Sequence, residues 1–153
     1  MVNTYTQIHL HIIFAVKYRQ GLIHHSWKDE LYKYITGIIQ RNNHKLLCIN
    51  GMPDHIHILV GMRPAQSISN LLQDIKADSS RWINEKNFLK IKFEWQEGYG
   101  AFSYGKSQLK DVITYIENQE EHHKKKTFTE EYRKFFQSFE IDFDEKYIFK
   151  ELI

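Results

Sequence analysis

Two hydrophobic periodicities alternate along this chain, and the order of that alternation limits the folds open to it. A two-residue period predicts strands, and apolar residues three to four positions apart predict helices. The expected strands are 5–16, 46–50, 55–60, 88–93 and 99–104. The expected helices are 27–41, one that starts after Ser67 and runs past Ile83, 107–123 and a last one over about 128–139. This order predicts an α+β fold, an antiparallel sheet with packed helices, related to the ferredoxin-like plan.

Short polar segments mark the ends of these elements. Ser26 and Ser67 stand where a side-chain hydroxyl can cap the first and second helices. The run Gly51-Met52-Pro53-Asp54 is typical of a turn and joins two expected strands into a hairpin. This turn leads directly into His55.

The length of 153 residues fits one domain. We expect a body over about residues 5–128, followed by an aromatic helix and an acidic tail over about 129–153. Cys48 is the only cysteine, which excludes an internal disulfide and favours a buried thiol. The longest apolar stretch is interrupted by His9 and His11, so no membrane segment is expected and a cytoplasmic protein is predicted.

The formal net charge is +2, but the charged residues are unevenly distributed along the chain. Residues 1–126 hold 17 Lys and Arg against 12 Asp and Glu, whereas residues 127–153 hold 4 against 7. The body could therefore attract a polyanion such as nucleic acid, although an ordinary solvated surface gives the same count.

Two histidine pairs have the spacing of residues on one face of a strand. His55 and His57 would project their imidazoles to the same side, with about 6.6 Å of rise between them, and two imidazoles so placed can hold one cation. His9 and His11 have the same spacing on the polar side of the first strand, where solvent or neighbouring groups would satisfy them. Spacing alone does not choose between the pairs.

The expected helix over residues 107–123 carries a second polar set. Tyr115 and Gln119 lie one turn apart beside the apolar stripe, and His122 is close to the same line. Such residues are most often surface side chains, so this alignment becomes informative only beside the histidine pair.

Taken together, these segments resemble a known family, the HUH-superfamily single-tyrosine transposases of the insertion sequence 200-like type. The resemblance extends from about Tyr5 to about Phe128. The matching segments are Lys17-Tyr18-Arg19, Pro53-Asp54-His55-Ile56-His57-Ile58-Leu59, Trp95-Gln96-Glu97-Gly98-Tyr99-Gly100-Ala101-Phe102-Ser103 and Tyr115-Ile116-Glu117-Asn118-Gln119. Each segment is weak alone, but their shared order and gaps are specific.

The resemblance implies a role for four residues. His55 and His57 would be the metal-binding HUH pair, Gln119 the third ligand of a divalent ion, Mg²⁺ or Mn²⁺, and Tyr115 the nucleophile. His9 and His11 fall outside the motif. Related replication initiators tend to carry a lysine one turn after the tyrosine, where this chain has Gln119, so the transposase branch fits better.

The resemblance also implies a reaction and its partners. Tyr115 would cleave single-stranded DNA that bears a hairpin, forming a 5′-phosphotyrosine, and a second 3′-end would reverse the step without ATP. His122 or water could assist loss of the tyrosine proton. The family acts as homodimers in which the tyrosine helix can complete the partner's site, which would make Gly105 a hinge.

Several residues are candidate DNA contacts. The phosphate candidates are Lys17, Arg19, Lys76, Arg81 and Lys106, and the candidates for stacking on bases are Tyr18, Tyr99 and Phe102. Two other functions stay open at this point. The chain could bind hairpins without cutting them, or it could be a metal-dependent nuclease that uses water and leaves Tyr115 structural.

Overall fold

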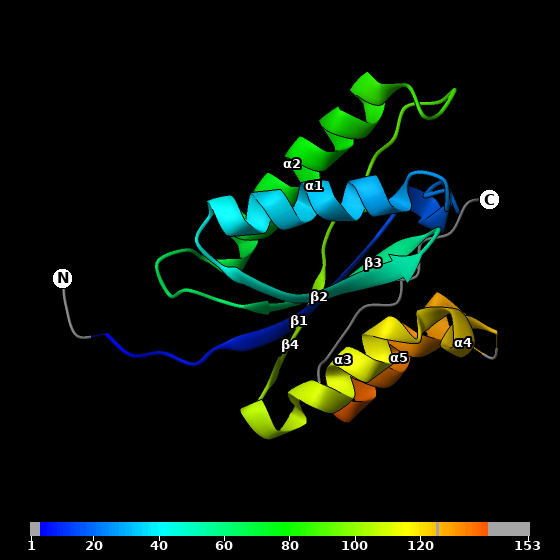
Figure 1. Cartoon of the computed structure of the whole chain (residues 1–153). Coiled ribbons are helices and arrows are strands. Elements are labelled where there is room, and N and C mark those ends of the chain that lie inside the picture. Colours follow the sequence, from blue (N-terminus) through cyan, green and yellow to red (C-terminus); the bar gives the residue numbers. More distant parts are fainter. Residues whose placement is uncertain (1–3, 125, 141–153) are drawn as a thin grey trace.

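A four-stranded antiparallel sheet with helices on both faces forms the molecule (Figure 1). The computed structural model describes residues 4–124 and 126–140. The strands are β1 (His9–Ala15), β2 (Lys45–Met52), β3 (His55–Gly61) and β4 (Gly100–Tyr104) in the order β2-β3-β1-β4. The helices are α1 (Lys28–Arg41), α2 (Ile68–Lys86), α3 (Leu109–Glu117), α4 (Gln119–His123) and α5 (Phe128–Ser138), with short 3₁₀ turns η1 (Lys17–Arg19) and η2 (Lys106–Gln108). The predicted α+β plan is confirmed.

Alternation along the two central strands gives the sheet two different faces. In β1 and β3 the even-numbered residues, such as Ile12 and Ile58, belong to the main core under α1 and α2. The odd-numbered residues face α3, α4 and α5 on the opposite side, as Figure 1 shows for the helices. His55 and His57 are odd-numbered, so the pleat of β3 directs both rings into this second layer.

The hairpin of β2 and β3 presents the histidines at the start of a central strand. Its register pairs Met52 with His55 and Asn50 with His57, and β1 pairs Ile13 with His57 on the other side. Gly51 allows the close approach, since a Cβ there would lie 2.3 Å from the carbonyl oxygen of His55.

Two predictions about local structure are wrong. Residues 88–93 do not form a strand, because the side chain of Asn84 hydrogen-bonds to the backbone of Phe93. Its Oδ1 accepts from the Phe93 N–H at 2.8 Å, and its Nδ2 donates to the Phe93 carbonyl at 3.2 Å. Ser26 does not cap α1, since its hydroxyl lies 2.8 Å from Nδ1 of His24. Ser67 does cap α2, accepting a hydrogen bond from the Asn70 backbone.

The single helix predicted over residues 107–123 is divided into η2, α3 and α4. The division between α3 and α4 lies at Asn118, with φ −97° and ψ 28°. Asn50 of β2 donates through Nδ2 to the carbonyls of Ile116, at 3.0 Å, and Glu117, at 3.2 Å. These bonds satisfy carbonyls that the end of α3 leaves open and attach that end to the sheet.

The last helix is confirmed as α5, which Thr127 caps through a bond from the Glu130 backbone. The expected acidic tail lies beyond residue 140, outside the described residues. None of the helices in residues 4–124 and 126–140 has the length and apolar character needed to span a membrane.

Candidate metal and tyrosine site

The two histidines of β3 are fully buried, and the Nδ1 atom of each ring hydrogen-bonds to a neighbouring side chain. Nδ1 of His55 lies 2.6 Å from Oδ1 of Asp54, and Nδ1 of His57 lies 2.7 Å from Nε2 of His11. A ring that donates from Nδ1 keeps the Nε2 lone pair free for a metal. Donation from Nδ1 in both rings would leave each Nε2, which faces the layer of α3, α4 and α5, able to bind a cation.

Of the two alternatives left open for His11, solvent is wrong and a neighbouring polar group is confirmed, since Nε2 of His11 hydrogen-bonds with His57. His11 is fully buried, and its ring stacks on that of His57 at a centroid distance of 5.0 Å. The polar side of β1 is covered by α3 and α5, which a single-strand pattern does not reveal. His11 thus contacts His57, one of the candidate ligands, through a hydrogen bond and ring stacking.

Gln119 reaches the histidines from α4. Its side chain is fully buried, and its Oε1 lies 3.2 Å from Nε2 of His55. The break at Asn118 starts a new helix at Gln119 beside the sheet. The structure therefore brings this predicted ligand to the histidine pair within one chain.

Tyr115 of α3 projects into the same space. Its ring lies 6.0 Å from the ring of His57, centroid to centroid, and its hydroxyl donates a hydrogen bond to Oε2 of Glu131. The ring of His122 is 4.4 Å away, but the hydroxyl is directed to the carboxylate. The nucleophile candidate and the histidine pair are thus neighbours in a single subunit.

Glu131, from α5, lies at the centre of this cluster. Its side chain is 3% exposed, and its Oε1 lies 3.1 Å from Nε2 of His57, 3.4 Å from Nε2 of His55 and 3.3 Å from Nε2 of His123. Among the described residues, His55, His57 and Glu131 form a group that could hold a metal ion, with ligand atoms within 4.8 Å of one another. Two imidazoles, a carboxylate and an amide oxygen are donors that divalent transition metals accept.

Charge pairing shifts the pKa values in this cluster. Burial alone would lower the pKa of His55, but the carboxylates of Asp54 and Glu131 outweigh it and raise the pKa to about 9. Burial would raise the pKa of Glu131, yet His123, His55 and His57 hold it well below its usual range. Glu131 is therefore an anion in contact with these rings.

The hydroxyl of Tyr115 is held in its protonated form. Burial, and then the negative charge and hydrogen bond of Glu131, raise the pKa of Tyr115 far above 10. A phenol in this state attacks poorly unless a bound cation or substrate changes its surroundings.

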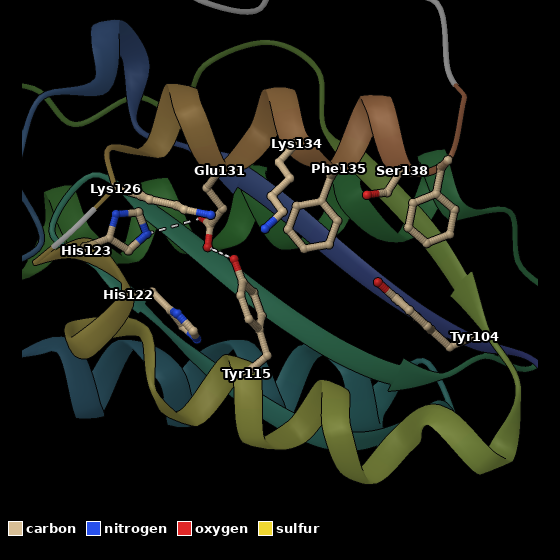
Figure 2. A pocket seen from close by; sticks show the side chains of 10 residues that line it. Tyr104, Tyr115, His122, His123, Lys126, Glu131, Lys134, Phe135 and Ser138 are labelled. Atoms are coloured by element: carbon tan, nitrogen blue, oxygen red, sulfur yellow. Dashed lines mark hydrogen bonds and ion pairs between the residues drawn. The ribbon is translucent and has the colours of Figure 1, made fainter.

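A pocket of about 320 Å³ connects this cluster to solvent (Figure 2). Tyr115, His123 and Glu131 line it together with Lys134, which points inward from α5, and Lys126, which reaches in from the segment between α4 and α5. Both lysines are exposed. An anionic group that entered here would meet two ammonium groups and the tyrosine hydroxyl.

The predicted DNA contacts lie in different surroundings. Lys17 pairs with Glu94 at 3.2 Å, Arg81 with Asp78 at 3.0 Å, and Lys106 is exposed. Arg19 donates to the hydroxyl of Thr129 at the start of α5, and its guanidinium lies over the ring of Phe128. Nζ of Lys76 donates to the carbonyls of Gln96 and Gly98, and burial lowers its pKa to about 8.

The aromatic candidates also differ. The Tyr99 side chain is 37% exposed, but Phe102 is 2% exposed and stacks on Phe135. Phe102 cannot stack on a base, so that prediction is wrong. Gly105 lies between β4 and η2 and donates its backbone N–H to Oε1 of Gln108.

Sequence reasoning missed Glu131, His123, Lys126 and Lys134. The signal for Glu131 was present, because it lies three residues after Phe128 and four before Phe135 on the apolar stripe of α5. A lone carboxylate on such a stripe needs a buried partner. His123 also had a signal, since it lies one helical turn after Gln119, whereas Lys126 and Lys134 have no comparable pattern.

Comparison with known proteins gives a consistent picture. Residues 4–119 match the family described as "Transposase IS200 like". The chain is similar to the ISDra2 transposase TnpA of Deinococcus radiodurans, with 26% identity over 118 residues that cover 74% of this chain and 84% of the relative. It is also similar to the transposase for insertion sequence element IS200 of Salmonella typhimurium, with 29% identity over 119 residues that cover 74% and 78% of the two chains.

Solved structures agree with these matches. A crystal structure described as that of a transposase from Deinococcus radiodurans superposes with a TM-score of 0.63 at 25% identity, covering 78% of this chain and 95% of the other. A REP-associated tyrosine transposase bound to a REP hairpin superposes with a TM-score of 0.61 at 13% identity, covering 80% and 73%. The predicted ferredoxin-like HUH fold is confirmed.

Proposed function

The chain belongs to the IS200-like transposase family, and from this premise we propose that it cleaves and rejoins single-stranded DNA through a covalent bond to Tyr115. The observation that carries the proposal is the convergence, within one subunit, of the Tyr115 ring with the donor atoms of His55, His57 and Gln119. A phenol beside a cation site is the arrangement that phosphodiester exchange needs.

The candidate ligands fit a divalent metal, Mg²⁺ or Mn²⁺. His55, His57 and Gln119 would hold the ion, and this assignment is supported by Asp54 and His11, which contact the Nδ1 atoms while both Nε2 atoms face the other donors. When bound, the metal supplies positive charge to a nonbridging phosphate oxygen. His55, His57 and Gln119, by holding the ion, would fix where the phosphate lies relative to Tyr115.

Tyr115 would act as the nucleophile in an in-line exchange. Its oxygen forms a bond to phosphorus while the bond from phosphorus to the 3′-oxygen breaks, and the released 3′-end receives a proton as the tyrosine loses one. The product is a 5′-phosphotyrosine, and attack by another 3′-hydroxyl reverses the step. One phosphodiester replaces another, so the exchange needs no ATP.

Single-stranded DNA with a hairpin is the proposed substrate. One relative of the same fold is described as bound to a REP hairpin, which supports a hairpin ligand here. The pocket beside Tyr115 carries Lys126 and Lys134, which would hold the cleaved phosphate. Lys17, Arg19, Lys76, Arg81 and Lys106 remain candidates for contacts to the rest of the strand.

A homodimer remains part of the proposal. Tyr115 and the metal donors approach one another within one chain, which supports a site assembled in cis. A site shared between subunits would require α3 and α4 to leave this position, with Gly105 as the hinge before them.

A labelled hairpin oligonucleotide, incubated with the protein and Mn²⁺, tests the function. We expect a protein–DNA adduct that resists denaturation and that a competing 3′-end releases. Cleavage without an adduct would instead indicate a nuclease that uses water, and binding without cleavage would indicate a hairpin-binding protein. Either result contradicts the proposal.

A further inference from the structure

The sequence beyond the family match contributes two donors to the cluster. The match ends at residue 119, whereas His123 lies at the end of α4 and Glu131 lies in α5. Both side chains are nearly inaccessible, with 8% and 3% exposed. Desolvating a carboxylate is costly, and three imidazoles around Glu131 offset that cost.

From this geometry we infer that Glu131 is a ligand of the metal and that it also positions the nucleophile, so that α5 completes the site. The inference rests on the proposed function and extends it to a segment outside the family match. His123 would join as a further imidazole ligand.

The separations between donor atoms suit a shared ion. Oε1 of Glu131 lies 3.1 to 3.4 Å from the Nε2 atoms of His57, His123 and His55. Oε1 of Gln119 lies 3.2 Å from Nε2 of both His55 and His123. Donors that each bind a metal at about 2.1 Å are separated from their neighbours by about 3.0 to 3.4 Å. The separations of these two oxygens from the imidazoles therefore match those between neighbouring ligands of one ion.

The two oxygens of Glu131 face different groups. Oε1 faces the imidazoles, whereas Oε2 accepts hydrogen bonds from the hydroxyl of Tyr115 and from Nε2 of Gln119, the latter at 3.2 Å. Coordination through Oε1 would leave Oε2 to hold the tyrosine oxygen next to the ion. The pocket reaches both Tyr115 and Glu131 from solvent, so a phosphate can approach with α5 in place.

The sharpest test is the binding of Mn²⁺ to the purified full chain by calorimetry. Glu131→Gln keeps the shape but removes the charge, and we expect it to weaken binding by about 100-fold or more. Glu130→Gln is the matched control, because Glu130 is the exposed neighbour on the same helix, and it should bind within about twofold of the wild type. Glu131→Asp should recover part of the loss.

A second readout tests the positioning role. At Mn²⁺ concentrations that saturate each variant, Glu131→Gln should lower kcat for adduct formation about tenfold or more with little change in KM for the hairpin. If Glu131→Gln does not fold, His123→Gln replaces it and should weaken Mn²⁺ binding about tenfold.

Unchanged or tighter Mn²⁺ binding by Glu131→Gln would overturn the inference, and tighter binding would mean that Glu131 competes with the ion for the histidines. Such a result leaves the proposed function intact if His57→Ala still abolishes Mn²⁺ binding. Tyr115→Phe also distinguishes the metal-ligand role of Glu131 from the proposed tyrosine chemistry. This variant should bind Mn²⁺ with the affinity of the wild type even though it forms no adduct.

Discussion

Nε2 of His11 lies 2.7 Å from Nδ1 of His57, and the two rings stack in the layer between the sheet and α3 and α5. His57 can donate its Nδ1 proton to His11 and keep Nε2 for a metal. Within the described part of the chain, Nδ1 of His11 has no hydrogen-bond partner. His11 therefore acts on His57 and not on a further polar group.

This contact predicts that metal affinity and stability respond differently to His11→Phe. Phenylalanine keeps a ring in the aromatic layer but leaves the Nδ1 proton of His57 without an acceptor, so Mn²⁺ affinity should fall about 10- to 100-fold. The free energy of unfolding should change by less than about 1 kcal/mol, since one unpaired nitrogen replaces another. Calorimetry and urea denaturation measure the two quantities, and equal Mn²⁺ affinity would contradict the role.

Tyr115→Phe should abolish the covalent adduct while hairpin binding survives. The substitution removes only the hydroxyl that would bond to phosphorus, and it leaves the lysines of the pocket unchanged. Denaturing gels detect the adduct, and a mobility shift detects binding. An adduct formed by the phenylalanine variant would assign the nucleophile elsewhere.

His57→Ala should eliminate metal-dependent cleavage and reduce Mn²⁺ affinity more than about 100-fold, because a buried ligand is lost. His25→Ala is the control, since His25 is exposed and lies outside the cluster. Wild-type cleavage that persists after thorough chelation would exclude a role for the metal.

Mn²⁺ should bind at least about tenfold more tightly than Mg²⁺. Imidazole nitrogens suit transition metals, whereas Mg²⁺ prefers an all-oxygen shell with several waters. Competition calorimetry, with Mg²⁺ present during titration of Mn²⁺, gives the ratio. Equal affinities would indicate that the imidazoles do not dominate the site.

Gly51→Ala should destabilise the metal-free protein by about 1 to 3 kcal/mol, because the added Cβ would lie 2.3 Å from the backbone oxygen of His55. Metal affinity should fall with it as the hairpin shifts. Gly37→Ala is the matched control in α1, where the added methyl meets nothing within 4 Å and should raise stability by about 0.5 to 1 kcal/mol. Urea denaturation distinguishes the two, and a stable Gly51 variant would contradict the close approach.

Much of the fold follows from periodicity in the sequence. The alternation in β1 and β3 predicts strands, and the spacing of His55 and His57 places both rings on one face, because the two-residue period is a local property of the backbone. The cap at Ser67 is equally local. The strand expected over residues 88–93 does not form, since the side chain of Asn84 at the end of α2, nine residues away, takes the backbone hydrogen bonds of Phe93.

The sequence by itself determined the antiparallel α+β plan, the shared face of His55 and His57 and, through resemblance, the choice of Tyr115 and Gln119. Only the tertiary structure decided which groups surround them. The burial of His11 depends on the layer that covers β1, and the place of Glu131 depends on how α5 packs over the sheet. Such contacts join residues far apart in the sequence, as His57 and Glu131 are at 74 positions, and no local period encodes them, because they arise from packing between elements.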